Sequence, residues 1–172
     1  MTWQRIPSLC CILVALALGA CNPAAIPTPP VANFATRFPV NLGGKTFRLQ
    51  IALTELEIKN GLMGRRALAP DEGMLFVFPD NARREFWMRN VPINLALGYF
   101  TADGHLDEIR PLIAENPETI PSRSTAIRYV LELSENAFAA NALGTGAQLD
   151  LAAVRSAIHQ RGFRPDAYLP PP

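Results

Sequence analysis

Several polar and aromatic side chains in this sequence could contact a ligand: Arg65, Trp87, Arg89 and Asn90, with Glu132 farther along. An arginine guanidinium binds carboxylate or phosphate through a planar fork of N–H donors, and a tryptophan face can lie against a cation. We expect the first four residues to form a binding site, with Glu132 as an orienting partner. For Arg65 the alternative is a structural ion pair, with Glu72 or Glu132 as its acid.

Three methionines, Met63, Met74 and Met88, lie in the same part of the sequence. Thioether sulfur is soft and selects Cu(I), so a Cu(I)-handling protein is one alternative function. Methionine also fills gaps in apolar cores. The sequence has no Met-x-Met or Met-x-x-Met cluster, and neither His105 nor His159 is near these methionines in the sequence. We therefore expect the three side chains in the core and no cofactor.

Catalytic patterns are weak in this chain. Neither histidine stands in a Ser or Asp context that suggests a triad, and the sequence has no Gly-rich phosphate loop, His-Glu-x-x-His or calcium loop. A carboxylate pair drawn from Glu72, Asp107 and Glu132 would suit a hydrolase, which is the second alternative. We expect the protein to bind a small molecule or another component of the cell envelope, without catalysis.

The block from Phe86 to Arg89 reads as part of a strand. Because successive strand side chains point to opposite faces, Phe86 and Met88 would share one face and Trp87 and Arg89 the other. Trp87 and Arg89 then either meet a ligand or cap one end of the fold. Alternation alone does not separate these two interpretations.

Short strands and turns must position these residues. The clearest strand covers residues 45–53, where apolar and polar residues alternate after a Gly43-Gly44 turn. A helix is expected at 55–60, because Thr54 and Glu57 have capping-box spacing. The remaining expected elements are strands at 74–78, 84–89, 93–100, 105–109, 127–133 and 148–151, a helix or irregular turn at 134–143, and a short helix at 154–160. This pattern predicts a mainly β fold, a single-domain antiparallel sandwich or barrel with two or three short helices.

The N-terminus predicts export. Arg5 precedes an apolar run at 9–18, which is about half the ~20 residues that a spanning helix needs. Leu18-Gly19-Ala20-Cys21 resembles the bacterial lipobox, in which the signal is cut before a cysteine that is then lipidated. We expect residues 1–20 to be a lipoprotein signal peptide and the protein to be held at a bacterial membrane, on the periplasmic or cell-surface side, through lipidated Cys21. The alternative is an ordinary secretory signal cut after Ala20.

Cysteine and charge content exclude several classes of site. Cys10 and Cys11 leave with the signal and no cysteine follows Cys21, so the mature domain has no disulfide, thiolate metal site or cysteine nucleophile. Removing Arg5 from the 16 Lys plus Arg leaves 15 basic residues against 15 acidic ones. A nucleic-acid binder needs a basic excess or stripe, so we expect no nucleic-acid partner.

Composition also divides the chain. Residues 21–36 combine the lipidated cysteine with a Pro-rich linker, residues 37–162 form the β-rich domain, and residues 163–172 form a Pro-rich tail without regular structure. The mature chain is long enough for one core and short for two.

Three spaced blocks carry a resemblance to a known family: residues 61–65 (Gly-Leu-Met-Gly-Arg), 73–78 (Gly-Met-Leu-Phe-Val-Phe) and 86–90 (Phe-Trp-Met-Arg-Asn). With residues 121–122, 128–133 and 144–146 they make the segment from about 40 to 151 similar to the domain of unknown function 192 family. The resemblance implies a compact, mostly β domain, often exported in bacteria, with no agreed reaction. The family's usual proline and aspartate after the Trp-Met block are replaced here by Asn94 and Ala96. Chemistry that used that aspartate would be lost, whereas a hydrogen bond at a strand start would matter little.

Overall fold

The computed structural model describes Met1 and residues 31–170. The predicted signal peptide, Cys21 and most of the predicted linker lie outside the described residues. None of the helices that the structure describes is long and apolar enough to cross a membrane.

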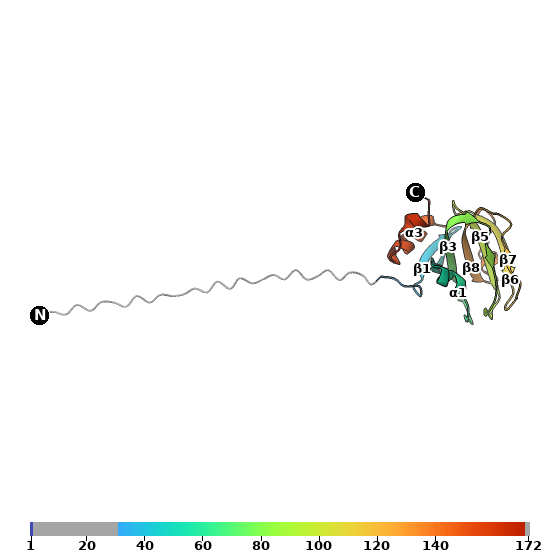
Figure 1. Cartoon of the computed structure of the whole chain (residues 1–172), viewed down its shortest axis with the longest axis horizontal. Coiled ribbons are helices and arrows are strands. Elements are labelled where there is room, and N and C mark those ends of the chain that lie inside the picture. The colour runs from blue at the N-terminus through green and yellow to red at the C-terminus, as the bar shows by residue number, and fades with distance from the viewer. Residues whose placement is uncertain (2–30, 171–172) are drawn as a thin grey trace.

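A six-stranded sheet forms the centre of the domain (Figure 1). Its strands, in spatial order, are β1 (Phe38–Leu42), β2 (Lys45–Ala52), β3 (Glu72–Ala82), β8 (Ile127–Ser134), β5 (Leu95–Thr101) and β6 (Leu106–Leu112). A second small sheet pairs β4 (Glu85–Phe86) with β7 (Ile120–Pro121). The prediction of a mainly β domain is confirmed.

The central sheet is mixed, because one of its strand pairs is parallel. β2 and β3 run parallel, whereas the pairs β1–β2, β3–β8, β8–β5 and β5–β6 are antiparallel. A parallel pair needs a crossover connection, and the segment between β2 and β3 supplies one that contains helix α1 (Glu55–Asn60). The expectation of a wholly antiparallel arrangement fails at this pair.

Helix α1 has the bounds that the capping-box spacing predicts. The Glu57 backbone N–H donates to Thr54 Oγ1 at 3.3 Å, and the Thr54 N–H donates to Glu57 Oε2 at 3.1 Å. Two backbone donors that the helix leaves free are thereby satisfied reciprocally.

Two predicted strands are largely absent. Only Glu85 and Phe86 of the predicted strand at 84–89 pair, because their partner β7 is two residues long. The predicted strand at 148–151 is reduced to isolated bridges from Leu149 to Leu42 and from Gln148 to His105. These bridges tie the end of β1 to the turn before β6.

The C-terminal half also contains short helices. Helix α2 (Ala137–Ala140) lies within the predicted 134–143. Helix α3 (Leu151–Gln160) begins three residues earlier than predicted, because the Asp150 side chain accepts the Ala153 N–H at 2.9 Å and caps the helix there. A 3-10 turn, η1 (Pro165–Ala167), forms in the tail that was expected to lack regular structure.

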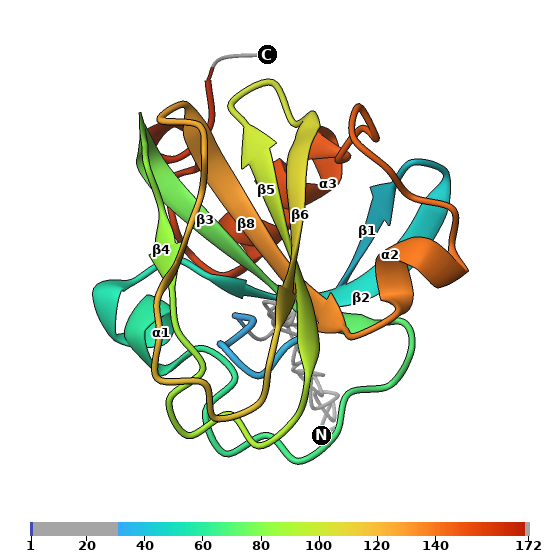
Figure 2. The same ribbon diagram turned by 90° about the vertical axis from the view of Figure 1, so that its right-hand side faces the viewer.

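Both faces of the sheet are covered by apolar clusters. Figure 2 shows α3 behind β8 and β5. Side chains such as Leu75 and Tyr129 belong to the cluster that also holds Val154 and Ile158 of α3. Their sequence neighbours Phe76 and Val130 belong to the opposite cluster, which also holds Leu62 and Met88. The second cluster is the one that borders the candidate site.

The folded unit extends beyond the predicted 37–162 on both sides. The Ala32 N–H donates to the Gln160 carbonyl at 3.1 Å, and Phe34 packs against the second cluster. Near the other end, Leu169 is 3% exposed and belongs to the core. Residues 31–170 therefore contain both core clusters and all the strands named above.

A buried arginine joins three of these elements. Arg161, just after α3, forms an ion pair with Glu57 of α1 (Nη2–Oε1 2.5 Å) and donates to the Ile51 carbonyl of β2. Its guanidinium also lies over the rings of Phe34 and Phe163. Burial alone would raise the pKa of Glu57, but the hydrogen bonds from Arg161 and from the Leu53 and Thr54 N–H groups hold that pKa below its ordinary value.

Replacement of Arg161 by methionine should destabilise the fold by about 3–5 kcal/mol, because it leaves the largely buried Glu57 carboxylate without its cation. Urea unfolding of residues 31–172 measures this loss. Arg66→Met, at an exposed arginine, is the matched control and should stay within about 0.5 kcal/mol of wild type. Equal stabilities of the two variants would show that the Arg161 contacts do not hold the elements together.

Candidate ligand-binding cavity

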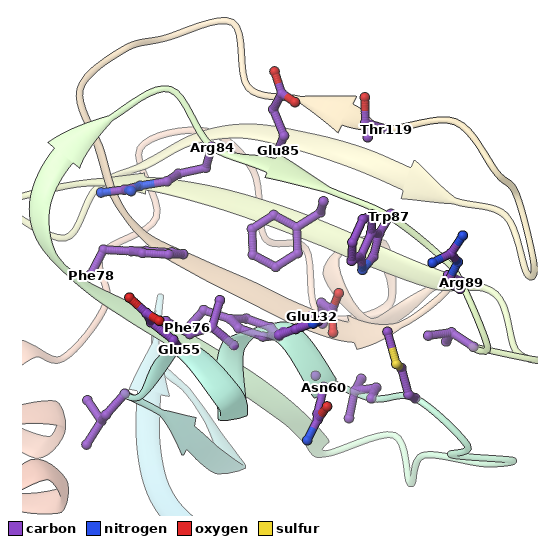
Figure 3. Close-up of a pocket in the computed structure, with 18 of the residues that line it drawn as sticks. Glu55, Asn60, Phe76, Phe78, Arg84, Glu85, Trp87, Arg89, Thr119 and Glu132 are labelled. Carbon is purple, nitrogen blue, oxygen red and sulfur yellow. The ribbon is translucent and has the colours of Figure 1, made fainter.

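A cavity of about 820 Å³ opens between α1, the end of β3 and the segment around β4 (Figure 3). We call it the α1–β4 cavity. Its size falls within the range typical of small-molecule sites. Much of its wall is apolar, with contributions from Leu62, Phe76, Phe78, Phe86 and Val91.

The most unusual group in the α1–β4 cavity is the carboxyl of Glu132. Glu132 lies in β8 directly between Met74 of β3 and Leu97 of β5, near the middle of the sheet. Strand alternation puts its side chain on the same face as Phe76 and Val130. The residue is only 4% exposed, yet it lines the cavity.

This carboxyl is not satisfied by the protein. Among the described residues, no group is hydrogen-bonded to Glu132 Oε2. Burial raises the pKa of Glu132 to about 8. Glu132 is therefore mostly a neutral acid at pH 7, able to donate a hydrogen bond into the cavity.

Trp87 and Arg89 stand at the edge of the α1–β4 cavity, at the same end as Glu132 (Figure 3). Trp87 is 43% exposed, and the guanidinium carbon of Arg89 lies 5.8 Å from the centroid of its ring. Within residues 31–170, the Arg89 side chain has no hydrogen bond or ion pair with a protein group. Its charge is thus available to a ligand.

The predicted alternation at residues 86–89 is present although β4 ends at Phe86. Phe86 packs edge-to-face on Phe76 (centroids 4.9 Å apart) and on Tyr99 (6.3 Å), and Met88 is fully buried. These buried neighbours fix the backbone on either side of Trp87. The arrangement leaves Trp87 and Arg89 facing outward at the cavity.

The opposite end of the α1–β4 cavity is closed by Arg84 and Phe78 (Figure 3). The Arg84 guanidinium lies 3.9 Å from the Phe78 ring centroid and donates to Asp80 Oδ1 at 2.8 Å. This hydrogen bond lowers the pKa of the exposed Asp80 carboxyl. Arg84 is therefore engaged in holding the wall, whereas Arg89 is not.

Two residues of the predicted site do not line this cavity. Arg65 donates to Gln50 Oε1 at 2.8 Å, and the Gln50 amide donates to the Phe34 carbonyl at 2.9 Å. Neither predicted ion pair of Arg65 forms: Glu72 pairs with Arg37 and Arg48 instead, and Glu132 has no ion pair with any described residue. Gln50 of β2 and Glu132 of β8 lie on either side of Met74 of β3 in the sheet. Arg65, which is hydrogen-bonded to Gln50, is therefore held two strands away from Glu132.

Asn90 has a role in the backbone. It adopts φ 57°, a left-handed conformation that asparagine tolerates better than most residues, and its carbonyl accepts the Gly64 N–H at 2.7 Å. This bond ties the loop after α1 to the segment after β4. Both loops contribute to the cavity wall, so Asn90 shapes the cavity without lining it.

The three methionines differ in how deeply they are buried. Met74 and Met88 are at most 1% exposed and belong to the second core cluster, whereas Met63 is half-buried and lines the cavity. Among the described residues, no group of three or more His, Cys, Asp or Glu side chains is placed to hold a metal ion. Of the carboxylates considered for hydrolysis, only Glu132 reaches the α1–β4 cavity; Glu72 and Asp107 do not line it.

Several polar residues that line the cavity were missed by sequence reasoning: Glu55, Lys59, Asn60, Arg83, Glu85 and Thr119. Glu55, Lys59 and Asn60 belong to α1, which the sequence did predict. The sequence did not show that α1 lies beside the Phe86–Asn90 block. Thr119 precedes β7, a two-residue strand that gives no periodic signal.

The family model described as "DUF192: Uncharacterized ACR" matches residues 38–151, and the chain belongs to this family. Among curated proteins, none matches the chain.

Among the solved structures that resemble the fold are two bacterial proteins. One, from Sinorhizobium meliloti 1021 and described as a "putative transcription regulator", is 29% identical, with a TM-score of 0.64 over 69% of this chain and 95% of its own. The other, a protein of unknown function from Novosphingobium aromaticivorans DSM 12444, is 27% identical, with a TM-score of 0.61 over 65% of this chain and 83% of its own.

Glu132→Gln should change how stability depends on pH. The folded protein keeps a proton on Glu132 up to about pH 8, whereas the unfolded chain releases it near the ordinary value of 4.5. Glu132 therefore makes its full contribution to the free energy of unfolding below pH 4.5. This contribution is lost as pH rises to about 8, at up to about 1.4 kcal/mol per pH unit.

Urea unfolding of wild type and Glu132→Gln from pH 5 to about pH 9 tests this slope. The difference between their free energies of unfolding should shift in favour of the glutamine variant until about pH 8 and then level off. A difference that is independent of pH would mean that Glu132 is not a buried acid.

Proposed function

We propose that this protein is a lipid-anchored extracytoplasmic domain that binds a small molecule in the α1–β4 cavity without transforming it. The observation that carries the proposal is the carboxyl of Glu132, which has no partner among residues 31–170, inside an apolar-walled cavity. An unsatisfied buried polar group costs about 1–3 kcal/mol, and a ligand that hydrogen-bonds to it removes that cost.

The cavity edge supports the same proposal. Trp87 offers a large exposed ring beside the free guanidinium of Arg89, at the end of the cavity where Glu132 lies (Figure 3). A mostly apolar cavity with a few convergent polar groups is the usual form of a small-molecule site. Arg65 and Asn90 contribute by holding the surrounding loops, through Gln50 and Gly64 respectively.

We favour binding over catalysis because neither of the carboxylates considered from the sequence as a hydrolytic partner of Glu132 lines the cavity with it. Glu72, one of the two proposed partners of Glu132, is engaged by Arg37 and Arg48. The other, Asp107, is an exposed residue of β6 outside the cavity.

We do not extend the description of the Sinorhizobium structure to this chain. The chain from residue 21 onward has 15 basic and 15 acidic residues, as counted above. Affinity for nucleic acid comes mainly from phosphate neutralisation by Lys and Arg, which this balance does not favour.

The membrane anchor is supported by the sequence at Leu18–Cys21 and by the sequence that follows it. The Pro-rich sequence between Cys21 and Ala32 suits a spacer between such an anchor and the domain.

Cys21→Ser should abolish incorporation of a radiolabelled or alkyne-tagged fatty acid in a bacterial expression host, because the thiol is the acceptor of the lipid. Cys11→Ser is the matched control and should be labelled like wild type. Equal labelling of wild type and Cys21→Ser would rule out the anchor.

Ligand binding should be visible in the fluorescence of Trp87, which is the only tryptophan after Trp3. A metabolite screen of residues 31–172 should yield compounds that shift its emission and raise Tm. Their affinity should fall about tenfold or more in Glu132→Gln, a loss typical of a buried hydrogen bond to a charged or strongly polar group.

The control variant is Glu118→Gln, an exposed carboxylate outside the cavity. Compounds that bind wild type and Glu132→Gln equally well would place the binding site elsewhere, and the proposal would then be wrong.

A further inference from the structure

We propose that the α1–β4 cavity takes a zwitterionic ligand, with an ammonium group against Glu132 and a carboxylate or phosphate against Arg89. The inference rests on the proposed function and specifies its ligand class. It starts from an acid, Glu132, and a base, Arg89, which line the same cavity and have no partner there among the described residues.

The two groups do not satisfy each other. No nitrogen of Arg89 lies within 4.0 Å of a Glu132 oxygen, since no ion pair joins them, although both line the cavity. Glu132 is buried, and Arg89 is exposed at the edge, at the same end of the cavity (Figure 3). A ligand that is cationic at its inner end and anionic at its outer end would satisfy both side chains at once.

The walls near Glu132 suit a cation. Phe76 and Phe86 pack edge-to-face in the cavity wall. Trp87 lies above Glu132 in Figure 3. Aromatic faces attract organic cations, with tryptophan the strongest of them. An ammonium that enters this place replaces part of its hydration shell by the carboxylate and the rings.

The other charged groups around the cavity roughly balance. Arg84 is paired with Asp80, and the Tyr99 hydroxyl near Glu132 donates to the Ile120 carbonyl at 2.6 Å. The remaining charged lining residues are two acids and two bases: Glu55, Glu85, Lys59 and Arg83. Glu132 therefore selects a positive charge at the inner end of a ligand, and Arg89 selects a negative charge at its outer end.

Binding of an ammonium group should release a proton. In the empty cavity Glu132 is mostly protonated below about pH 8. The bound form pairs a Glu132 carboxylate with the ligand ammonium, so the Glu132 proton passes to solvent. Affinity should therefore rise about tenfold per pH unit up to about pH 8 and then level off.

A matched set of ring compounds tests the ligand class on residues 31–172. The probes are 4-(aminomethyl)benzoate with both charges, 4-methylbenzoate with the anion, 4-methylbenzylamine with the cation and 4-methylbenzyl alcohol with neither. Straight-chain ω-amino acids of increasing length vary the spacing between the charges. Binding is followed by Trp87 emission and by calorimetry in buffers of different ionisation enthalpy, which counts the protons released.

We expect at least one zwitterion to bind about tenfold or more tightly than both its singly charged analogues, with close to one proton released well below pH 8. Glu132→Gln should remove the proton release and the pH dependence. Arg89→Gln should remove the advantage over the amine alone and leave the proton release intact. Arg66→Gln, the exposed arginine control, should bind like wild type.

Two results overturn the inference in distinguishable ways. If the neutral alcohol or the anion binds as well as every zwitterion, in a manner sensitive to Glu132→Gln, the cavity is a binding site for another ligand class. If no probe, charged or neutral, alters Trp87 emission or Tm, the ligand class is contradicted, and the proposed function is contradicted as well only if the metabolite screen of residues 31–172 also yields no binding compound.

Discussion

The ion pair between Glu57 and Arg161 is the contact on which the rest of this structure depends. Glu57 accepts the backbone N–H groups of Leu53 and Thr54 at the start of α1, and the same carboxylate binds Arg161. One carboxylate thus begins the helix and fixes it to the end of α3. Because α1 forms one wall of the α1–β4 cavity, the shape of the candidate site follows from a contact on the far side of the helix.

The second constraint is the position of Glu132 in the sheet. A strand residue between Met74 and Leu97, on a covered face, is normally apolar, since an unpaired carboxyl there opposes folding. The fold tolerates it at the wall of a cavity, where a bound molecule can reach it. A group that lowers the stability of the empty protein in this way can raise its selectivity for a ligand that satisfies the carboxyl.

Local patterns predicted the local structure well. Thr54 and Glu57 located α1, and the alternation at 45–53 located β2, because in both cases the signal lies within a few residues. Long-range pairing was not predictable: the parallel β2–β3 pair and the two-residue β7 depend on partners distant in the sequence. At the site, alternation gave the face on which Trp87 and Arg89 lie, but the depth of Glu132 and the Arg65–Gln50 bond required the assembled sheet.

Part of the cavity wall comes from residues that follow the segment matched by the family model. The segment that matches the family ends at Leu151, whereas Arg161, Ala167 and Tyr168 follow it in the sequence. Arg161 secures α1, and the other two residues line the α1–β4 cavity. Without the residues after 151, Glu57 would lack this cation and the cavity would lack these two lining side chains. The shape of the candidate cavity can therefore vary with the sequence that follows the family segment, while the sheet within that segment stays unchanged.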